Sequence, residues 1–363
     1  MLKRDGVYLA LALATTAAVG CGGGGETPGS GGSSGNGGST SSVSSSSSSG
    51  SSSSSGEATS SSTGGLTCTS GEGVVLAGTK LFFGEGNSGQ WKKFGFNLDS
   101  LVSNAASKDV CQLNAGASGL TPYPDGDEGI DNSFGKNLLP QIISLYPNWV
   151  TDVDNGLKAG TFTVLLKMEC LPPTGDVPSF TTKLFGGTTL GMAPKFDGTD
   201  KWPVAPDLLS DPKDPESSTI LFSNSSVVGT SYDSGNKETF VLTVPIATKT
   251  TSTSIKLTLY SAHTTMTLSE DRKSATGGMI GGVLNTEEFV AEIKKVGALL
   301  NLCDSALFTN LVNQIRQASD IMADGTQDPS KECNGISMGL GFEMKAVQLG
   351  VVGPPTPVGK SCQ

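Results

Sequence analysis

The residues best suited to chemistry form a short acidic loop at positions 125–132, with the sequence DGDEGIDN. Carboxylate and amide oxygens alternate there with glycine, and Ca²⁺ prefers six to eight oxygen ligands of this kind. The two glycines allow the backbone to turn tightly enough for the side chains to converge. The pattern therefore predicts a calcium site with these ligands: Asp125, Asp127, Asp131 and Asn132.

Two other interpretations of this loop stay open. It is no EF-hand, because Ile130 takes the sixth place, where that motif needs glycine, and Lys136 takes the twelfth, where it needs glutamate. Aspartate and asparagine also cap turns and helix starts through bonds to backbone amides, which requires no metal. A hydrolase could instead use carboxylates near Asp127 and Asp131, although no aromatic-lined cleft accompanies them.

The rest of the chain offers little for catalysis. The one histidine, His263, lies within a predicted strand, and no G-x-S-x-G motif occurs. No C-x-x-C pair occurs either, so neither a thioredoxin-type redox centre nor a cysteine-rich zinc site is expected. The sequence therefore assigns no catalytic residue.

The N-terminus carries an export signal. Lys3 and Arg4 precede an apolar run at 7–19, which has the length found in signal peptides and is too short to cross about 30 Å of hydrocarbon. The run ends in Ala-Val-Gly-Cys, which follows the bacterial lipobox pattern except that alanine replaces the usual leucine. We therefore expect a lipoprotein signal peptide at 1–20 and lipid attachment at Cys21.

A stretch rich in Gly, Ser and Thr follows and extends to residue 65. It has too few apolar side chains to fold, and about 44 residues of such coil reach roughly 35–40 Å. Residues 21–65 are thus expected to be a lipid anchor with a disordered linker to a folded body, residues 66–363. Because Gly22 follows the cysteine, the sorting rule of enteric bacteria favours the outer membrane, with the body facing the periplasm or the cell surface.

The charge balance limits the class of partner. Removal of residues 1–20 takes away two basic residues and one acidic residue, which leaves 22 Lys and Arg against 33 Asp and Glu, a net charge of −11. An acidic chain without a basic patch is a poor nucleic-acid binder and is repelled by anionic lipid. The expected partners are the bilayer, through the acyl anchor, and a carbohydrate or protein ligand.

Seven cysteines occur, and six remain if Cys21 carries lipid. An even number in an exported chain predicts three disulfides among these residues: Cys68, Cys111, Cys170, Cys303, Cys333 and Cys362. Spacing alone leaves fifteen pairings. We expect Cys303–Cys333 across a helix, Cys111–Cys170 within the first half, and Cys68–Cys362 between the two ends.

The body is expected to be mainly β. Segments rich in Val, Ile, Thr, Leu and Phe predict strands, without the alternation of strands and helices that marks a parallel sheet. They lie at 73–84, 91–98, 161–168, 219–223, 239–246 and 254–268. In the last one, the apolar phase reverses near Ser261, which predicts a β-bulge. An antiparallel, jelly-roll-like β-sandwich with a small two-helix segment in the C-terminal third accounts for this pattern.

Helical spacing is also present. Apolar residues at 138, 139, 142, 143 and 146 predict a helix over 136–146. Asn285 is expected to cap a second helix and Asp304 a third, with Gly325 as the stop signal of the third. A strand then follows at 336–344, where apolar side chains alternate with small ones. Glycine at 339 and 341 would let another layer, or a ligand, approach its outer face.

The whole layout resembles the uncharacterised predicted lipoproteins of myxobacteria, which combine a lipobox cysteine, a Gly/Ser linker and a cysteine-containing β domain. The stretches DGDEGIDNSFG (125–135), GGMIGGVL (277–284) and RQASDIMADGTQDPSKEC (316–333) carry the resemblance. It implies an envelope location and no particular activity. We expect a non-enzymatic binding or adhesion module, with a glycan or matrix ligand; the alternatives are a hydrolase and a structural envelope component.

Overall fold

The structure is a computed structural model that describes residues 72–85, 89–114, 123–235, 237–247, 252–355 and 359–363. All of them belong to the second of the two units into which the chain divides, residues 62–363. The predicted signal peptide, Cys21, the linker and Cys68 lie outside the described residues. None of the described helices has the length and apolar character needed to span a bilayer.

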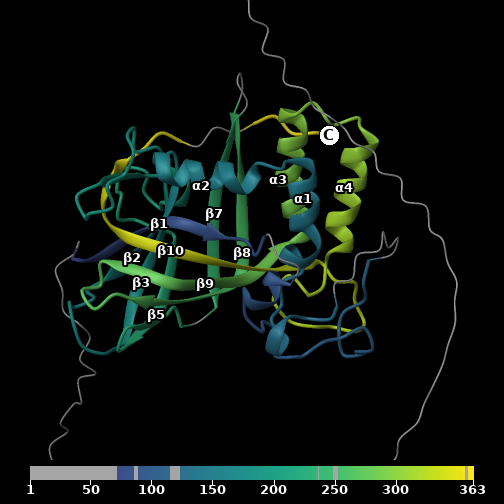
Figure 1. Cartoon of the computed structure of the whole chain (residues 1–363), viewed down its shortest axis with the longest axis horizontal. Coiled ribbons are helices and arrows are strands. Elements are labelled where there is room, and N and C mark those ends of the chain that lie inside the picture. Colours follow the sequence, from purple (N-terminus) through teal and green to yellow (C-terminus); the bar gives the residue numbers. More distant parts are fainter. Residues whose placement is uncertain (1–71, 86–88, 115–122, 236, 248–251, 356–358) are drawn as a thin grey trace, which may run out of the picture. The chain divides into compact units, whose positions relative to one another are not determined.

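Ten strands form one mixed sheet (Figure 1). They are β1 (Gly73–Phe82), β2 (Thr163–Glu169), β3 (Val177–Gly187), β4 (Lys201–Val204), β5 (Ile220–Val228), β6 (Ser231–Asp233), β7 (Glu238–Ala247), β8 (Ser252–Leu268), β9 (Ser274–Asn285) and β10 (Gly335–Val352). The mainly β character predicted from the sequence is confirmed.

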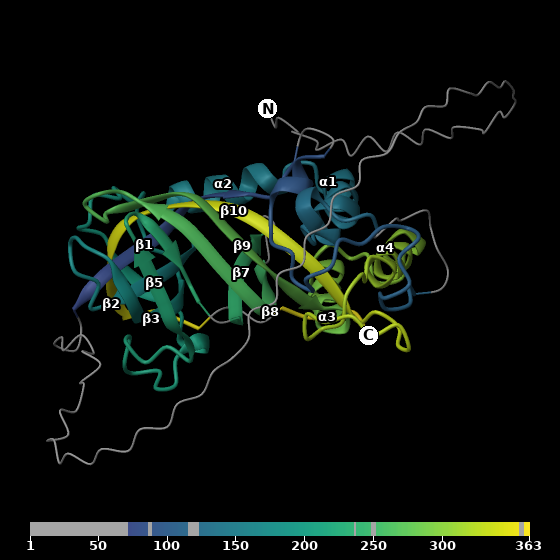
Figure 2. The ribbon, with the colours of Figure 1, turned by 90° about the horizontal axis from the view of Figure 1, so that it is seen from below.

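The predicted antiparallel sandwich is corrected. Eight strands pair in a closed ring, β1-β2-β3-β5-β6-β8-β9-β10, and β10 pairs back with β1. β7 pairs with the first half of β8, while β4 runs parallel to the end of β10. The physical reason is strand length, because β8 and β10, with 17 and 18 residues, each reach different neighbours at their two ends. Figure 2 shows β10 curving along the sheet.

The core lies on both faces of strands β1 to β3. Leu166 packs into the main cluster inside the ring, whereas its neighbour Leu165 joins a smaller cluster with Trp202 and Val204 of β4. Successive strand residues point to opposite faces, so a strand covered on both sides is apolar at consecutive positions. The apolar gap inside the ring measures about 20 Å³, roughly room for one water. Side chains of the chain itself therefore fill the ring.

Four α-helices are present among the described residues: α1 (Leu139–Leu145), α2 (Trp149–Ala159), α3 (Thr286–Leu299) and α4 (Ala306–Gln317). The two C-terminal helices confirm the expected two-helix segment, and α1, α3 and α4 gather at one end of the sheet (Figure 1). The Asn285 side chain caps α3 by accepting from the backbone N–H groups of Glu287 and Glu288. The cap of α4 is Ser305 and not Asp304, since the Ser305 hydroxyl accepts from the Phe308 N–H at 3.2 Å.

The expected strand over residues 91–98 and the expected helix stop at Gly325 are both wrong, whereas the expected bulge near Ser261 is confirmed. Residues 91–98 form no strand but continue from the short helix η1 (Gln90–Lys93) as irregular chain. Gly325 does not end α4, which stops at Gln317; its φ of 80° instead serves a turn after Met322. The bulge near Ser261 is confirmed by its positive φ of 48° and a register shift in the pairing with β9.

The expected disulfide pairings are also corrected. Cys111 bonds to Cys333, and Cys303 bonds to Cys362. Backbone pairing explains the first, because residue 112 forms a parallel bridge with residue 332. The second follows from the C-terminal segment lying along α3, where the Cys362 N–H donates to the Lys294 carbonyl at 3.2 Å. Cys170 is disulfide-bonded too, and its partner lies outside the described residues.

Candidate functional site

The acidic loop belongs to a layer on the outer face of β9 and β10, which we call the cap: residues 89–114 and 123–134. At Gly339 of β10, a Cβ atom would lie 2.2 Å from the Phe94 carbonyl oxygen and 2.5 Å from the Gly95 Cα. At Gly281 of β9 it would lie 2.7 Å from the Phe96 ring. The expectation that a further layer approaches the glycines of this strand is confirmed, and the layer comes from the chain itself.

Asn132 joins the cap to both the strand and the following helix. Its side-chain amide donates to the Phe94 carbonyl at 3.0 Å and to the Gly339 carbonyl at 3.2 Å. Its side-chain oxygen accepts from the backbone N–H groups of Gly135, at 2.9 Å, and Gly339, at 3.2 Å. Because the side chain is only 2% exposed, these bonds replace water for a fully buried amide.

Two buried aspartates lie in the same region. Asp131 is 2% exposed, and its Oδ2 accepts from the Leu98 N–H at 2.7 Å. Asp320, which follows α4, is 4% exposed and accepts from both the backbone N–H and the hydroxyl of Ser337, at 2.8 and 2.5 Å. Both carboxyl groups are thus bonded to groups of the chain and are shielded from solvent.

Serine hydroxyls extend the network. The Ser133 N–H donates to the Ser337 hydroxyl at 2.8 Å, and that hydroxyl donates in turn to Asp320. The Ser133 hydroxyl donates to the Ala318 carbonyl at 2.6 Å. The Tyr123 hydroxyl donates to the Asp320 carbonyl at 2.6 Å. Ser337 is fully buried and bonded on both sides, so its hydroxyl is arranged to fasten the cap and not to attack a substrate.

Burial shifts the pKa values of charged groups in the cap and beside it. It raises the pKa of Asp131 to about 9, with repulsion from Asp320 as the next cause. It raises the pKa of Asp320 to about 7 and that of Asp125 to about 6, although hydrogen bonds from serine groups favour their charged forms. Burial also lowers the pKa of Lys136 to about 8. The stability of this region should therefore depend on pH.

The side chains of the predicted calcium loop bond mainly to backbone groups. Asp125 accepts from the Ser103 N–H at 2.5 Å, while Asp131 and Asn132 make the bonds given above. Asp127 is exposed in the short helix η2 (Asp127–Gly129). Within the described ranges, no group of three or more His, Cys, Asp and Glu side chains could hold a metal ion. The bond from the Gly135 N–H to Asn132 is a local cap of the expected kind, whereas Asp125 and Asp131 bond to backbone groups of distant segments. Asp127 and Asp131 lie in different environments, one exposed and the other buried.

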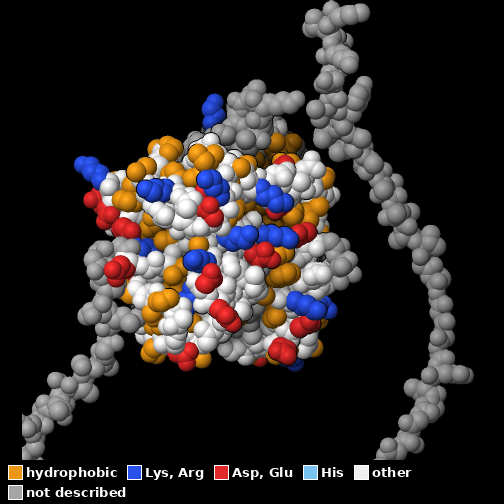
Figure 3. All heavy atoms as spheres, turned by 60° about the vertical axis from the view of Figure 1, so that its left-hand side comes forward, with side chains coloured by type: hydrophobic (Ala, Val, Ile, Leu, Met, Phe, Trp, Pro, Cys, Tyr) orange, Lys and Arg blue, Asp and Glu red, His pale blue; other side chains and the backbone are white. Residues whose placement is uncertain are grey.

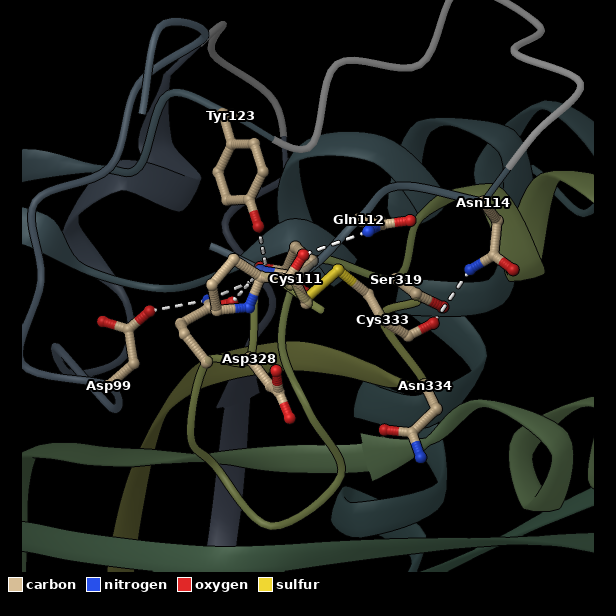
Figure 4. The surroundings of a disulfide bond; sticks show 12 residues. Asp99, Cys111, Gln112, Asn114, Tyr123, Ser319, Asp328, Cys333 and Asn334 are labelled. Carbon is tan, nitrogen blue, oxygen red and sulfur yellow. Dashed lines mark hydrogen bonds between the residues drawn. A yellow bond between two sulfur atoms is a disulfide. The ribbon is translucent and has the colours of Figure 1, made fainter. Parts of the chain in front are cut away.

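A disulfide fastens the cap to the segment that leads into β10 (Figure 4). Beside it, the Asn114 amide donates to the Cys333 carbonyl at 2.9 Å. The Gln327 side chain accepts from the Cys111 N–H at 2.8 Å and donates to Asp99 at 2.7 Å. The cap is therefore held both by a disulfide and by buried and partly buried hydrogen bonds, so its polar residues serve to stabilise the fold.

The second candidate site is a cavity that is open to solvent. This cavity of about 260 Å³ lies between α3 and β8. Its lining consists of Lys256, Thr258, Leu284, Asn285, Glu288, Phe289, Ala291 and Glu292. Residues 255, 257 and 259 of β8 point into the core, and the alternate residues Lys256 and Thr258 line the cavity.

Charges of both signs line this cavity. The Tyr260 hydroxyl donates to the Glu288 carboxylate at 2.9 Å, and burial followed by this bond raises the pKa of Tyr260. Glu292 accepts from the Lys256 backbone N–H at 2.9 Å and pairs with Lys295 at 2.5 Å. In the described part of the chain, neither the Glu288 carboxylate nor the Lys256 ammonium forms a salt bridge.

This cavity was not expected from the sequence. The helix cap at Asn285 was expected, but neither Glu288 nor Lys256 was assigned to a site. A signal was present: positions 256, 258 and 260 are polar along a predicted strand, and Glu288 and Glu292 lie one helical turn apart. What the sequence lacks is the information that these two faces meet.

No protein-family model matches the chain, and neither a curated protein nor a solved structure was found to be similar to it. The function must therefore be inferred from the residues themselves.

Proposed function

We propose that this chain is an exported lipoprotein, anchored to the outer membrane through an acylated Cys21, whose folded body is a non-enzymatic binding module. The main support for the proposal is that most of the cysteines are disulfide-bonded. Cys111, Cys333, Cys303 and Cys362 form two disulfides, and Cys170 is disulfide-bonded as well. Disulfides of this kind are typical of an oxidising compartment outside the cytoplasm.

The two disulfides use four of the seven cysteines, which leaves Cys21 and Cys68 as the candidate partners of Cys170. Cys21 ends a lipobox-like sequence, and acyl chains at about 0.8 kcal/mol per buried CH₂ would hold the body at a bilayer. We assign the lipid to Cys21 and the third disulfide to Cys68 and Cys170. The lipobox and the linker also support the proposed relation to myxobacterial lipoproteins.

The site chemistry favours binding over hydrolysis. A hydrolase based on Asp127 and Asp131 needs both carboxyl groups to reach a substrate, whereas Asp131 is buried and bonded to Leu98. The cavity between α3 and β8 offers solvent-accessible polar groups instead. On the face seen in Figure 3, basic and acidic side chains are interspersed, which is unlike the single-sign surface of a nucleic-acid binder.

Metabolic labelling with a palmitate analogue tests the anchor. We expect label on the wild-type chain in the membrane fraction and its loss in Cys21→Ala. Cys68→Ala is the matched control, and it should keep the label because acylation precedes folding. Label that survives Cys21→Ala, or a chain found unlabelled in the cytosol with reduced thiols, would contradict the proposal.

A further inference from the structure

We propose, on the premise that the body is a binding module, that the cavity between α3 and β8 binds a small zwitterion: a ligand with one ammonium group and one carboxylate group on a short apolar chain. Lys256 would receive the ligand carboxylate, and Glu288 would receive its ammonium group. The two residues face the same cavity from two different elements, β8 and α3.

The lining of the cavity contains charged side chains of both signs. Glu292, the other carboxylate in the lining, is paired with Lys295 at 2.5 Å. Glu288 has only the neutral Tyr260 hydroxyl as a hydrogen-bond partner, and Lys256 has no salt bridge among the residues that the structure describes. The lining thus contains one glutamate and one lysine that form no salt bridge among the described residues. A purely anionic ligand would meet Glu288, and a purely cationic one would meet Lys256, whereas a zwitterion satisfies both.

The surroundings of Glu288 also favour an ammonium ligand. It lies in the first turn of α3, where the backbone dipole favours an anion. The Tyr260 hydroxyl lies 2.9 and 3.0 Å from its two oxygens and shares one proton between them. The carboxylate is therefore held in place with acceptor capacity left over, since each oxygen has two lone pairs. An ammonium group, with three donors, fits that capacity.

The size and floor of the cavity restrict the ligand. Leu284 and Phe289 are 2% and 3% exposed and, with Ala291, form an apolar part of the lining. The volume of about 260 Å³ corresponds to roughly eight or nine waters at about 30 Å³ each. A ligand with five to nine heavy atoms and a short methylene chain fits this space. A sugar ring fits less well, because no aromatic face with an exposed ring lines the cavity.

The test uses the mature chain with its disulfides intact and a series of ω-amino acids: glycine, 4-aminobutyrate and 6-aminohexanoate. Isothermal titration calorimetry should detect saturable binding of at least one member, because the series varies the spacing of the two charges. Butylamine and butyrate, which carry one charge each, should bind roughly tenfold more weakly or not at all. Glucose provides a neutral, hydroxyl-rich comparison.

Three variants identify the site. Glu288→Gln and Lys256→Met should each weaken binding of the best zwitterion by roughly tenfold or more, since each removes one charge-assisted contact. Glu287→Gln is the matched control: it is the neighbouring residue of the same helix turn, but its carboxylate pairs with Arg316 of α4 at 2.6 Å. Binding should persist in this variant. Circular dichroism of all three confirms that the fold is retained.

Two results would overturn the inference. If no ω-amino acid binds at 10 mM, or if binding survives both Glu288→Gln and Lys256→Met, the cavity is not a zwitterion site. If butyrate, butylamine or glucose binds as tightly as the best zwitterion, the ligand class is wrong even though binding as such is supported. Failure of the proposed function would be seen separately, as an unlabelled wild-type chain or as label that survives Cys21→Ala.

Discussion

Gly339→Ala is expected to detach the cap from β10. The added methyl group would lie 2.2 Å from the Phe94 carbonyl oxygen and 2.5 Å from the Gly95 Cα, and both are backbone atoms that cannot rotate away. Relief of contacts this short requires the cap backbone to move by about 1 Å, which disrupts the two bonds between Asn132 and Gly339. Overpacking costs about 1–3 kcal/mol, and each lost hydrogen bond adds about 0.5–1.5 kcal/mol. We therefore expect a loss of about 3 kcal/mol in the free energy of unfolding.

Differential scanning calorimetry measures this loss, which for a domain of this size should lower Tm by roughly 6–12 °C. The matched control is Gly78→Ala in β1 of the same sheet. There the new Cβ would lie 3.4 Å from the Thr163 hydroxyl oxygen, an ordinary contact. The control should change Tm by less than about 3 °C. Equal effects of the two substitutions, or an unchanged Tm for Gly339→Ala, would refute the close packing of cap and strand.

Three further predictions follow from buried charges and from the disulfide of the cap. Because the pKa of Asp131 is raised to about 9, the folded chain retains a proton that the unfolded chain releases near pH 4. The free energy of unfolding should therefore fall as pH rises between these values, by up to about 1.4 kcal/mol per pH unit, and Asp131→Asn should flatten this dependence in urea titrations from pH 5 to 8. Replacement of Cys111 and Cys333 by alanine should cost about 2–5 kcal/mol in chemical denaturation, against no loss if the bond is absent in solution. Lys167 is 1% exposed and pairs with Glu216, so Glu216→Gln should destabilise by about 2–4 kcal/mol, whereas the double change with Lys167→Met should recover most of the loss.

Sequence patterns were sufficient where the interacting residues are neighbours along the chain. Asn285 caps its helix through the amides two and three residues ahead. The bulge at Ser261 changes the phase of a single strand, and the alternation over 336–344 defines the two faces of another. Each of these features depends on local backbone geometry, which the residue types reveal directly.

Features that depend on distant partners were not predictable. Residues 91–98 alternate like a strand, but their place is on the glycines of β9 and β10, and no local signal identifies that contact. Cysteine spacing did not reveal that a β-bridge between Gln112 and Glu332 brings Cys111 next to Cys333. Strand patterns likewise define faces but not neighbours, so the closed ring could not be distinguished from a sandwich.

The same holds for the candidate sites: their residue types could be seen in the sequence, but the contacts between distant segments could not. The sequence shows the polar residues of the acidic loop, but Asp125 and Asp131 bond to backbone groups of other segments, such as the Leu98 N–H that donates to Asp131. Asp320 joins the same network from beyond α4. The cavity at Glu288 and Lys256 exists only because a helix lies against a strand, and a linear sequence gives the composition of each face without their contact.

Mass spectrometry of the unreduced protein, extracted from membranes and cleaved by protease, tests the proposed lipoprotein most directly. We expect an N-terminal peptide that begins at an acylated Cys21, together with a disulfide-linked pair of peptides that contain Cys68 and Cys170. A disulfide between Cys21 and Cys170, or a chain that retains residues 1–20 and carries only free thiols, would contradict it.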